Sequence, residues 1–180
     1  MASGDLNEQY PHLFSEVFWP WEPAWAVFVL LEKVPPVDLI ANVNIVPYTG
    51  EKWVVIQLDD GTWEIPGGTL EPGESYMDTI HRELVEEVGV ELLSWQLIGA
   101  WQCLSLAEKP YRPYLPFPQY YRLALQGEIK FISTPANPAD GEKVISVELA
   151  SLETIAVRFI AQNRYDLAEL YQLASSLNKR

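Results

Sequence analysis

The chain has 180 residues, a length that suits one compact domain with small terminal additions. Its composition, 48% apolar and 21% charged, is that of a folded soluble protein, and its formal net charge is −13. This charge argues against nucleic acid as a partner, because binding to a phosphate backbone depends on Lys and Arg. A small phosphorylated substrate held through bridging cations remains compatible with it.

The single cysteine, Cys103, excludes an intramolecular disulfide and a multi-cysteine metal cage. The first ten residues lack the basic start of a signal peptide. The longest apolar run, residues 24–31, is too short for a bilayer, which takes roughly 20 residues. We therefore expect a cytoplasmic protein with no membrane partner.

Residues 1–37 are predicted to form an N-terminal appendage that is rich in Trp and Pro. Trp19, Trp21 and Trp25 lie among prolines, and Pro35 and Pro36 close the segment because neither can donate a backbone hydrogen bond. One interpretation is a homodimer arm or a lid over a substrate. The other is a short helix packed on the core, since Trp is good core material.

Residues 38–180 are predicted to form one α+β domain with the helices beyond Ser151 included. β-branched runs predict several strands, with a hairpin turn around Gly50. The strands are expected at residues 39–48, 52–58, 96–103, 119–125, 129–133 and 143–149. Apolar spacing predicts helices at residues 74–88 and in the C-terminal tail.

The helix expected at residues 74–88 places three carboxylates on one face. With about 100° per residue, Glu87 lies about 40° and Glu86 about 60° from Glu83. Such neighbours repel one another in a bare helix, whereas a hard cation that prefers oxygen ligands would reverse that cost. The alternative is a solvated acidic face. Ser75 is expected to cap the start of the helix, and Gly89 suits the left-handed position at its end.

Spacing decides between these interpretations. The segment from Gly68 to Val90 has the pattern G-x5-E-x7-R-E-U-x-E-E-x-G-U, where U is a bulky aliphatic residue. It resembles the Nudix box of the Nudix hydrolase superfamily at every specified position. Those positions are Gly68, Glu74, Arg82, Glu83, Leu84, Glu86, Glu87, Gly89 and Val90.

The resemblance implies an α/β/α sandwich with a mixed central sheet, in which the box forms a loop–helix–loop. It also implies a hydrolase that needs Mg²⁺, with Mn²⁺ as an alternative. The bond cut would be a diphosphate linkage in a nucleoside diphosphate derivative: a nucleotide, a dinucleotide or a nucleotide sugar.

The site residues follow from the same resemblance. Arg82 is expected to pair with Glu74 and to orient Glu83, and Gly68 is expected to serve the backbone conformation. The general base is either Glu83 or Glu142, which precedes a predicted strand. The expected metal ligands are Glu83, Glu86, Glu87 and the carbonyl of Gly67.

The loop at residues 108–121 is the candidate for substrate binding. It is rich in proline and aromatic residues, and Tyr114 and Phe117 could stack on a base while Arg112 meets a phosphate. A plain proline-rich surface loop is the alternative.

A non-catalytic Nudix domain that senses a ligand or docks a partner is the alternative function. The intact box counts against it, as does the tail after Ala150, which is too short and too acidic for a winged helix.

Overall fold

The computed structural model describes residues 3–138 and 143–178. The strands are β1 (Val17–Trp19), β2 (Ala24–Leu30), β3 (Ile40–Thr49), β4 (Lys52–Leu58), β5 (Trp63–Glu64), β6 (Gly67–Thr69), β7 (Val90–Ser105), β8 (Gln119–Phe131) and β9 (Val144–Ala150). The helices are α1 (Ser3–Gln9), α2 (Tyr76–Glu83), α3 (Leu152–Ile160) and α4 (Tyr165–Asn178), with a 3₁₀ turn η1 (Val37–Leu39) and a π-helical turn η2 (Leu84–Val88).

The strands of the described chain form one mixed sheet in the order β1-β2-β7-β8-β3-β4-β5. β6 pairs with β3 and β9 pairs with β4, off this path. β3 and β8 run parallel while the other pairs are antiparallel. The hairpin expected around Gly50 is confirmed, because Thr49 pairs with Lys52 across it.

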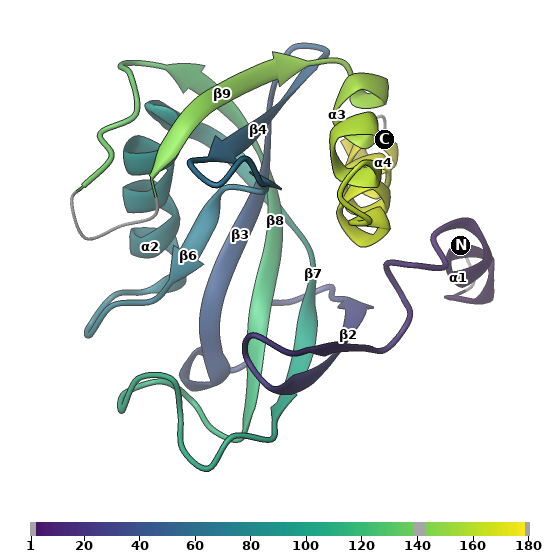
Figure 1. Cartoon of the computed structure of the whole chain (residues 1–180), viewed down its shortest axis with the longest axis vertical. Helices are drawn as coiled ribbons and strands as arrows, with labels where there is room; N and C mark the ends of the chain where they lie inside the picture. Colours follow the sequence, from purple (N-terminus) through teal and green to yellow (C-terminus); the bar gives the residue numbers. More distant parts are fainter. Residues whose placement is uncertain (1–2, 139–142, 179–180) are drawn as a thin grey trace.

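Helices cover both faces of this sheet, so the expected α/β/α sandwich is confirmed (Figure 1). On one face, Ile80 and Leu84 of the α2–η2 segment are fully buried in a cluster that includes Ile45 of β3. On the other face, Phe159 of α3 and Tyr171 of α4 are buried in a second cluster. No helix among the described residues is long and apolar enough to cross a membrane.

The segment expected as an appendage supplies two strands to the sheet. β2 pairs with β7 from Ala24 opposite Ser105 to Leu30 opposite Gly99, and β1 adds the edge strand. The segment also contains the short helix α1, although Trp19 and Trp25 lie on strands. The strands at residues 17–30 are therefore part of the sandwich in space, whereas residue 37 as a domain boundary stays a prediction.

The strands expected at residues 119–125 and 129–133 are one continuous strand, β8, and the prediction of two was wrong. Gly127 lies in the middle of β8 rather than at its end. A Cβ at Gly127 would lie 2.8 Å from the Ser94 carbonyl oxygen and 2.5 Å from Leu92. The glycine permits close approach of neighbouring chains and does not mark a turn.

The C-terminal tail is helical as expected, but in two pieces. α3 and α4 are separated at Asn163, whose φ of 62° is left-handed. In α4, Leu167, Leu170 and Tyr171 of the predicted stripe are buried. The Tyr171 hydroxyl donates to the Val54 carbonyl at 2.6 Å, which fixes the helix on β4.

The acidic helix is confirmed between residues 76 and 88, but its last turn is wider than an α-helical turn. The Gly89 amide donates to the Leu84 carbonyl at 2.9 Å, five residues back, which makes η2 a π-helical turn. Such turns occur mostly as single insertions in α-helices, often at functional sites. Gly89 then ends the helix with a left-handed φ of 77°, as expected.

Gly89 has a second constraint, because a Cβ there would overlap the Ser133 backbone carbonyl. We predict that Gly89→Ala lowers the free energy of unfolding by about 3 kcal/mol, from the left-handed φ plus this overlap. Gly61→Ala is the matched control, since Gly61 has a φ of 88° and a Cβ added there would meet no atom within 4 Å. We expect a loss of about 1 kcal/mol for the control. Equal losses in urea denaturation would contradict the overlap.

Candidate active site

The start of the acidic helix is fixed by a capping interaction at Ser75. Ser75 caps α2 as expected: its Oγ accepts from the Asp78 amide at 3.2 Å, and the Asp78 carboxylate accepts from the Ser75 amide at 2.9 Å. This reciprocal pair satisfies two backbone donors at the helix start. It also places Glu74, the residue before the cap, beside the first turn of the helix.

Arg82 contacts three carboxylates at once. Its Nε donates to Glu74 at 2.8 Å, so the pairing that the resemblance implies is present. Its Nη1 donates to Glu83 at 2.7 Å and to Glu86 at 3.3 Å. Its Nη2 reaches Glu74 again at 3.0 Å and the Thr69 carbonyl at 3.3 Å. One guanidinium thus offsets the repulsion among these acids and joins α2 to β6.

The pKa values of these acids are shifted in different directions. The hydrogen bond from Arg82 lowers the pKa of Glu74 from 4.5 to about 2. Burial raises the pKa of Glu83 above its ordinary value, although Arg82 acts in the opposite direction. Arg82 itself is held firmly in its charged form, since its hydrogen bond to Glu74 raises its pKa. Glu74 is therefore structural in character, whereas Glu83 holds a proton more readily than an exposed glutamate.

The backbone at Gly67 and Gly68 lies against the acidic helix. A Cβ at Gly68 would overlap the Glu83 carboxylate, so a side chain here would displace Glu83 from its contact with Arg82. Glu87 is 7% exposed, and its Oε2 accepts from the Gly67 amide at 2.9 Å. The expected ligands Glu83, Glu87 and Gly67 are therefore neighbours.

The carboxylates do not yet point at one centre. No three acidic, histidine or cysteine side chains of the described residues converge as a metal would require. Glu83 and Glu86 are turned to Arg82, and Glu87 is turned to the Gly67 amide. Oxygen donors of this kind suit Mg²⁺ or Mn²⁺, and side-chain rotation would bring them to a shared ion. The donor set therefore fits a hard divalent cation.

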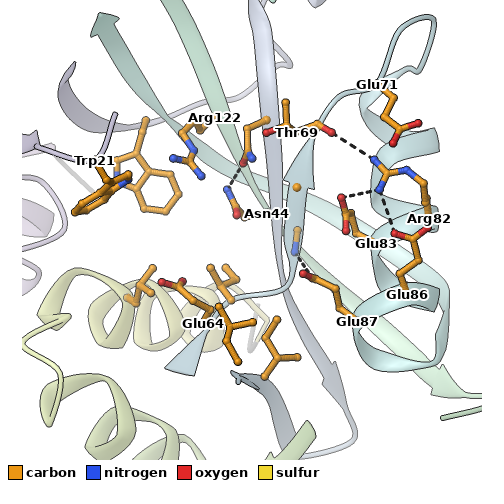
Figure 2. Close-up of a pocket in the computed structure, with 18 of the residues that line it drawn as sticks. Trp21, Asn44, Glu64, Thr69, Glu71, Arg82, Glu83, Glu86, Glu87 and Arg122 are labelled. Atoms are coloured by element: carbon orange, nitrogen blue, oxygen red, sulfur yellow. Dashed lines mark hydrogen bonds and ion pairs between the residues drawn. The ribbon is translucent and has the colours of Figure 1, made fainter. Parts of the chain in front are cut away.

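These residues form one end of a cleft of about 760 Å³ (Figure 2). Figure 2 places Arg82, Glu83, Glu86 and Glu87 on one side of Asn44 and Trp21 on the other. The lining is Trp19, Trp21, Asn42, Asn44, Ile56, Leu58, Glu64, Ile65, Gly67, Gly68, Thr69, Glu71, Arg82, Glu83, Glu86, Glu87, Trp101, Arg112, Tyr114, Arg122, Pro138, Arg164 and Leu167.

The loop before β8 contributes part of what was expected of it. Arg112 and Tyr114 line the cleft. Within the described chain Arg112 has no ion pair, whereas Arg82, Arg122 and Arg164 each have at least one. Phe117 does not line the cleft and is 38% exposed, so the loop as it stands does not bring it to this wall. Glu142, the other candidate base, lies outside the described residues.

Two asparagines on β3 belong to the site although the sequence did not predict them. Asn42 and Asn44 are each 8% exposed, line the cleft, and are joined by a hydrogen bond of 2.8 Å. Residues two apart in a strand share a face. Polar residues with this spacing in an otherwise apolar strand were the available signal, since buried amides need partners.

The opposite end of the cleft was anticipated only in part, by the interpretation of the Trp-rich segment as a lid over a substrate. It brings together Trp19 and Trp21 from the N-terminal segment, Glu64 from β5 and Arg122 from β8. No local spacing links these positions, which come from three separate parts of the chain.

The sequence of this chain is similar to those of known proteins. The family model of the NUDIX domain matches residues 38–172. A putative 8-oxo-dGTP diphosphatase of Bacillus subtilis is 26% identical over 121 residues, which cover 63% of this chain and 76% of that protein. An RNA pyrophosphohydrolase of Helicobacter pylori is 36% identical over 52 residues, only 27% of this chain and 34% of that protein.

Among solved structures, a Bacillus subtilis pyrophosphohydrolase superposes with a TM-score of 0.56. Its sequence is 20% identical, and the match covers 75% of this chain and 76% of that one. This likeness shows the fold.

The low pKa of Glu74 makes stability depend on pH. Because its folded-state pKa of about 2 lies below the ordinary 4.5, its contribution is present above pH 4.5 and is lost as the pH falls towards 2. We predict that Glu74→Gln is less stable than the wild type at neutral pH and loses less stability on acidification below pH 4.5. Urea denaturation across the acid range measures this. Parallel acid curves for the two proteins would contradict it.

Proposed function

This chain belongs to the Nudix hydrolase family, and we propose that it is a divalent-metal-dependent pyrophosphohydrolase of nucleoside diphosphate derivatives. The observation that carries the proposal is the meeting of Glu83, Glu86, Glu87 and Arg82 at one end of a cleft, beside the backbone at Gly67. The cleft has the size usual for small-molecule sites.

The cation would be held by Glu83, Glu86 and Glu87 with the carbonyl of Gly67. Mg²⁺ is the expected ion, with Mn²⁺ as an alternative, because all four donors are oxygens. When bound, the cation neutralises phosphate oxygens and lowers the pKa of bound water.

The chain's own residues have complementary roles in the proposal. Arg82 orients Glu83 and Glu86 through its Nη1, which keeps both carboxylates at the acidic end of the cleft. Glu83 accepts the proton of the attacking water, and its raised pKa suits a general base. Arg112 binds a substrate phosphate, since its guanidinium lines the cleft and has no acidic partner among the described residues.

A nucleotide as the substrate is supported by the relatives, which are described as acting on 8-oxo-dGTP and on RNA. The four Trp and Tyr side chains in the cleft lining also suit a base. A ligand-sensing domain without catalysis is the alternative. The complete acidic set, held ready by Arg82, favours catalysis, because a sensor has no need of three metal-binding carboxylates.

We predict that Glu87→Gln lowers kcat/KM by about a hundredfold or more, because it removes one charge from the metal site. The fold survives, since the amide oxygen can still accept from the Gly67 amide. Glu86→Gln should behave in the same way. The control is Glu91→Gln, which changes an exposed glutamate paired with Lys130 at 3.0 Å outside the cleft. A Glu87→Gln variant with wild-type turnover and an unchanged Mg²⁺ dependence would refute the metal assignment.

The activity itself is tested by measuring phosphate and pyrophosphate release from purified protein. The substrates are nucleoside triphosphates, ADP-ribose, NADH, dinucleoside polyphosphates and nucleotide sugars. We expect hydrolysis of at least one class with Mg²⁺ and none after chelation by EDTA. No hydrolysis of any substrate, combined with tight binding of one, would favour the sensor function.

A further inference from the structure

The end of the cleft opposite the acidic helix is bounded by an aromatic stack from the N-terminal segment. Trp19 is 6% exposed, and its ring packs against Trp101 at 6.3 Å. Trp21 stacks on Trp19 with ring centroids 6.0 Å apart and an interplanar angle of 19°, yet it is 67% exposed. A rigid indole backed by a buried one and open at the rim of a cleft is a stacking surface for a planar ligand.

This stack lies before residue 38, where the match to the family model begins. Trp19 ends β1, and β1 is attached to the sheet through β2 and β7. The stack of Trp19 and Trp21 is therefore a fixed part of the fold, but it lies outside the segment that the family model matches.

A carboxylate and a guanidinium lie beside this stack. Figure 2 shows Glu64 below and Arg122 beside Trp21, all bordering the same space. The charge of Arg122 reaches Glu64, where it partly offsets the rise in pKa that burial causes. The Arg122 guanidinium lies 5.1 Å from the centre of the Trp19 ring and 3.6 Å from the Glu22 carboxylate, so it is held in place.

Glu64 is only partly neutralised. Its Oε1 accepts from Arg164 at 2.9 Å, but the same guanidinium also binds Asp166 through two bonds of 3.1 and 3.2 Å. One positive charge is thus shared by two carboxylates. The Glu64 side chain is 28% exposed and borders the cleft, so its carboxylate can also accept hydrogen bonds from a ligand bound there.

We propose that this end of the cleft is a nucleobase subsite that selects guanine. The base stacks on Trp21, Glu64 accepts from its N1–H and its exocyclic amino group, and Arg122 donates to its carbonyl oxygen O6. The subsite rests on the proposed function only in that the phosphates of the same nucleotide lie towards the acidic helix, which borders the same cleft.

The hydrogen-bond pattern explains the choice of base. An ionised carboxylate can only accept, and guanine alone among the common bases presents two adjacent donors on one edge. Adenine offers one donor next to a ring nitrogen that accepts, which Glu64 would repel. Guanine also carries the carbonyl oxygen that an arginine prefers, whereas adenine has an amino group there.

The test compares kcat/KM for GTP, ITP and ATP with Mg²⁺, because ITP lacks only the exocyclic amino group of GTP. We expect wild-type protein to prefer GTP to ATP by about tenfold or more, with ITP between them. Glu64→Gln should lower the ratio of GTP to ATP severalfold and leave only the smaller preference that Arg122 gives to O6. Trp21→Ala should weaken all three by about tenfold, since stacking is similar for every purine.

Glu148→Gln is the matched control. Glu148 is also a glutamate bound to an arginine, Arg158 at 3.1 Å, but it does not line the cleft. Its substitution should leave the ratio of GTP to ATP unchanged. A Glu64→Gln variant in which both substrates lose equally would overturn the inference, because that is the effect of a merely structural pair with Arg164. Equal use of GTP and ATP by the wild type would overturn it too.

Calorimetric titration with GDP and with ADP separates this inference from the proposed activity. If no nucleotide is hydrolysed but GDP binds more tightly than ADP and Glu64→Gln reduces the difference, the subsite stands and the hydrolase proposal fails. If nucleotides are hydrolysed and the two diphosphates bind alike, the subsite fails and the hydrolase stands.

Discussion

The arrangement of this site depends on one cation, the guanidinium of Arg82. Three glutamates within reach of it, Glu74, Glu83 and Glu86, would otherwise repel one another across two turns of helix. Because a guanidinium has five donors in a rigid plane, it can serve several carboxylates without moving. Its bond to the Thr69 carbonyl adds the strand β6 to the group. Arg82 thus fixes the acidic helix and β6 relative to each other before any metal ion binds.

That relation explains why the contacts within this segment could be predicted from the sequence. The positions from Gly68 to Val90 interact with one another over short separations, so their spacing carries the geometry. Ser75 as cap and Gly89 as helix end were likewise recognisable from local chemistry. The π-helical turn was not, because an α-helical wheel assumes 3.6 residues per turn throughout. It widens the helix between Leu84 and Gly89, where two of the acids lie.

The rest of the cleft could not be derived from local patterns. Asn42 and Asn44 can be recognised as cleft residues only when the position of β3 between β8 and β6 is known. Trp19 and Glu64 are distant in the sequence and meet only through the order of strands in the sheet. The continuity of β8 through Gly127 is non-local too, because it depends on the close approach of Leu92 and Ser94 of β7. Such non-local contacts are what a single sequence does not display.

The two ends of the cleft therefore have different origins in the chain. The acidic end is built by one continuous segment and would be the same for any substrate with a diphosphate. The aromatic end is built by the edge strand β1, by β5 and by the distant strand β8, and none of Trp19, Glu64 and Arg122 is among the hydrogen-bond partners of Arg82. Glu64 lies three residues before Gly67, so the short β5–β6 segment is common to both ends. In the proposed binding mode, a change of base at one end would leave the phosphates beside the glutamates at the other.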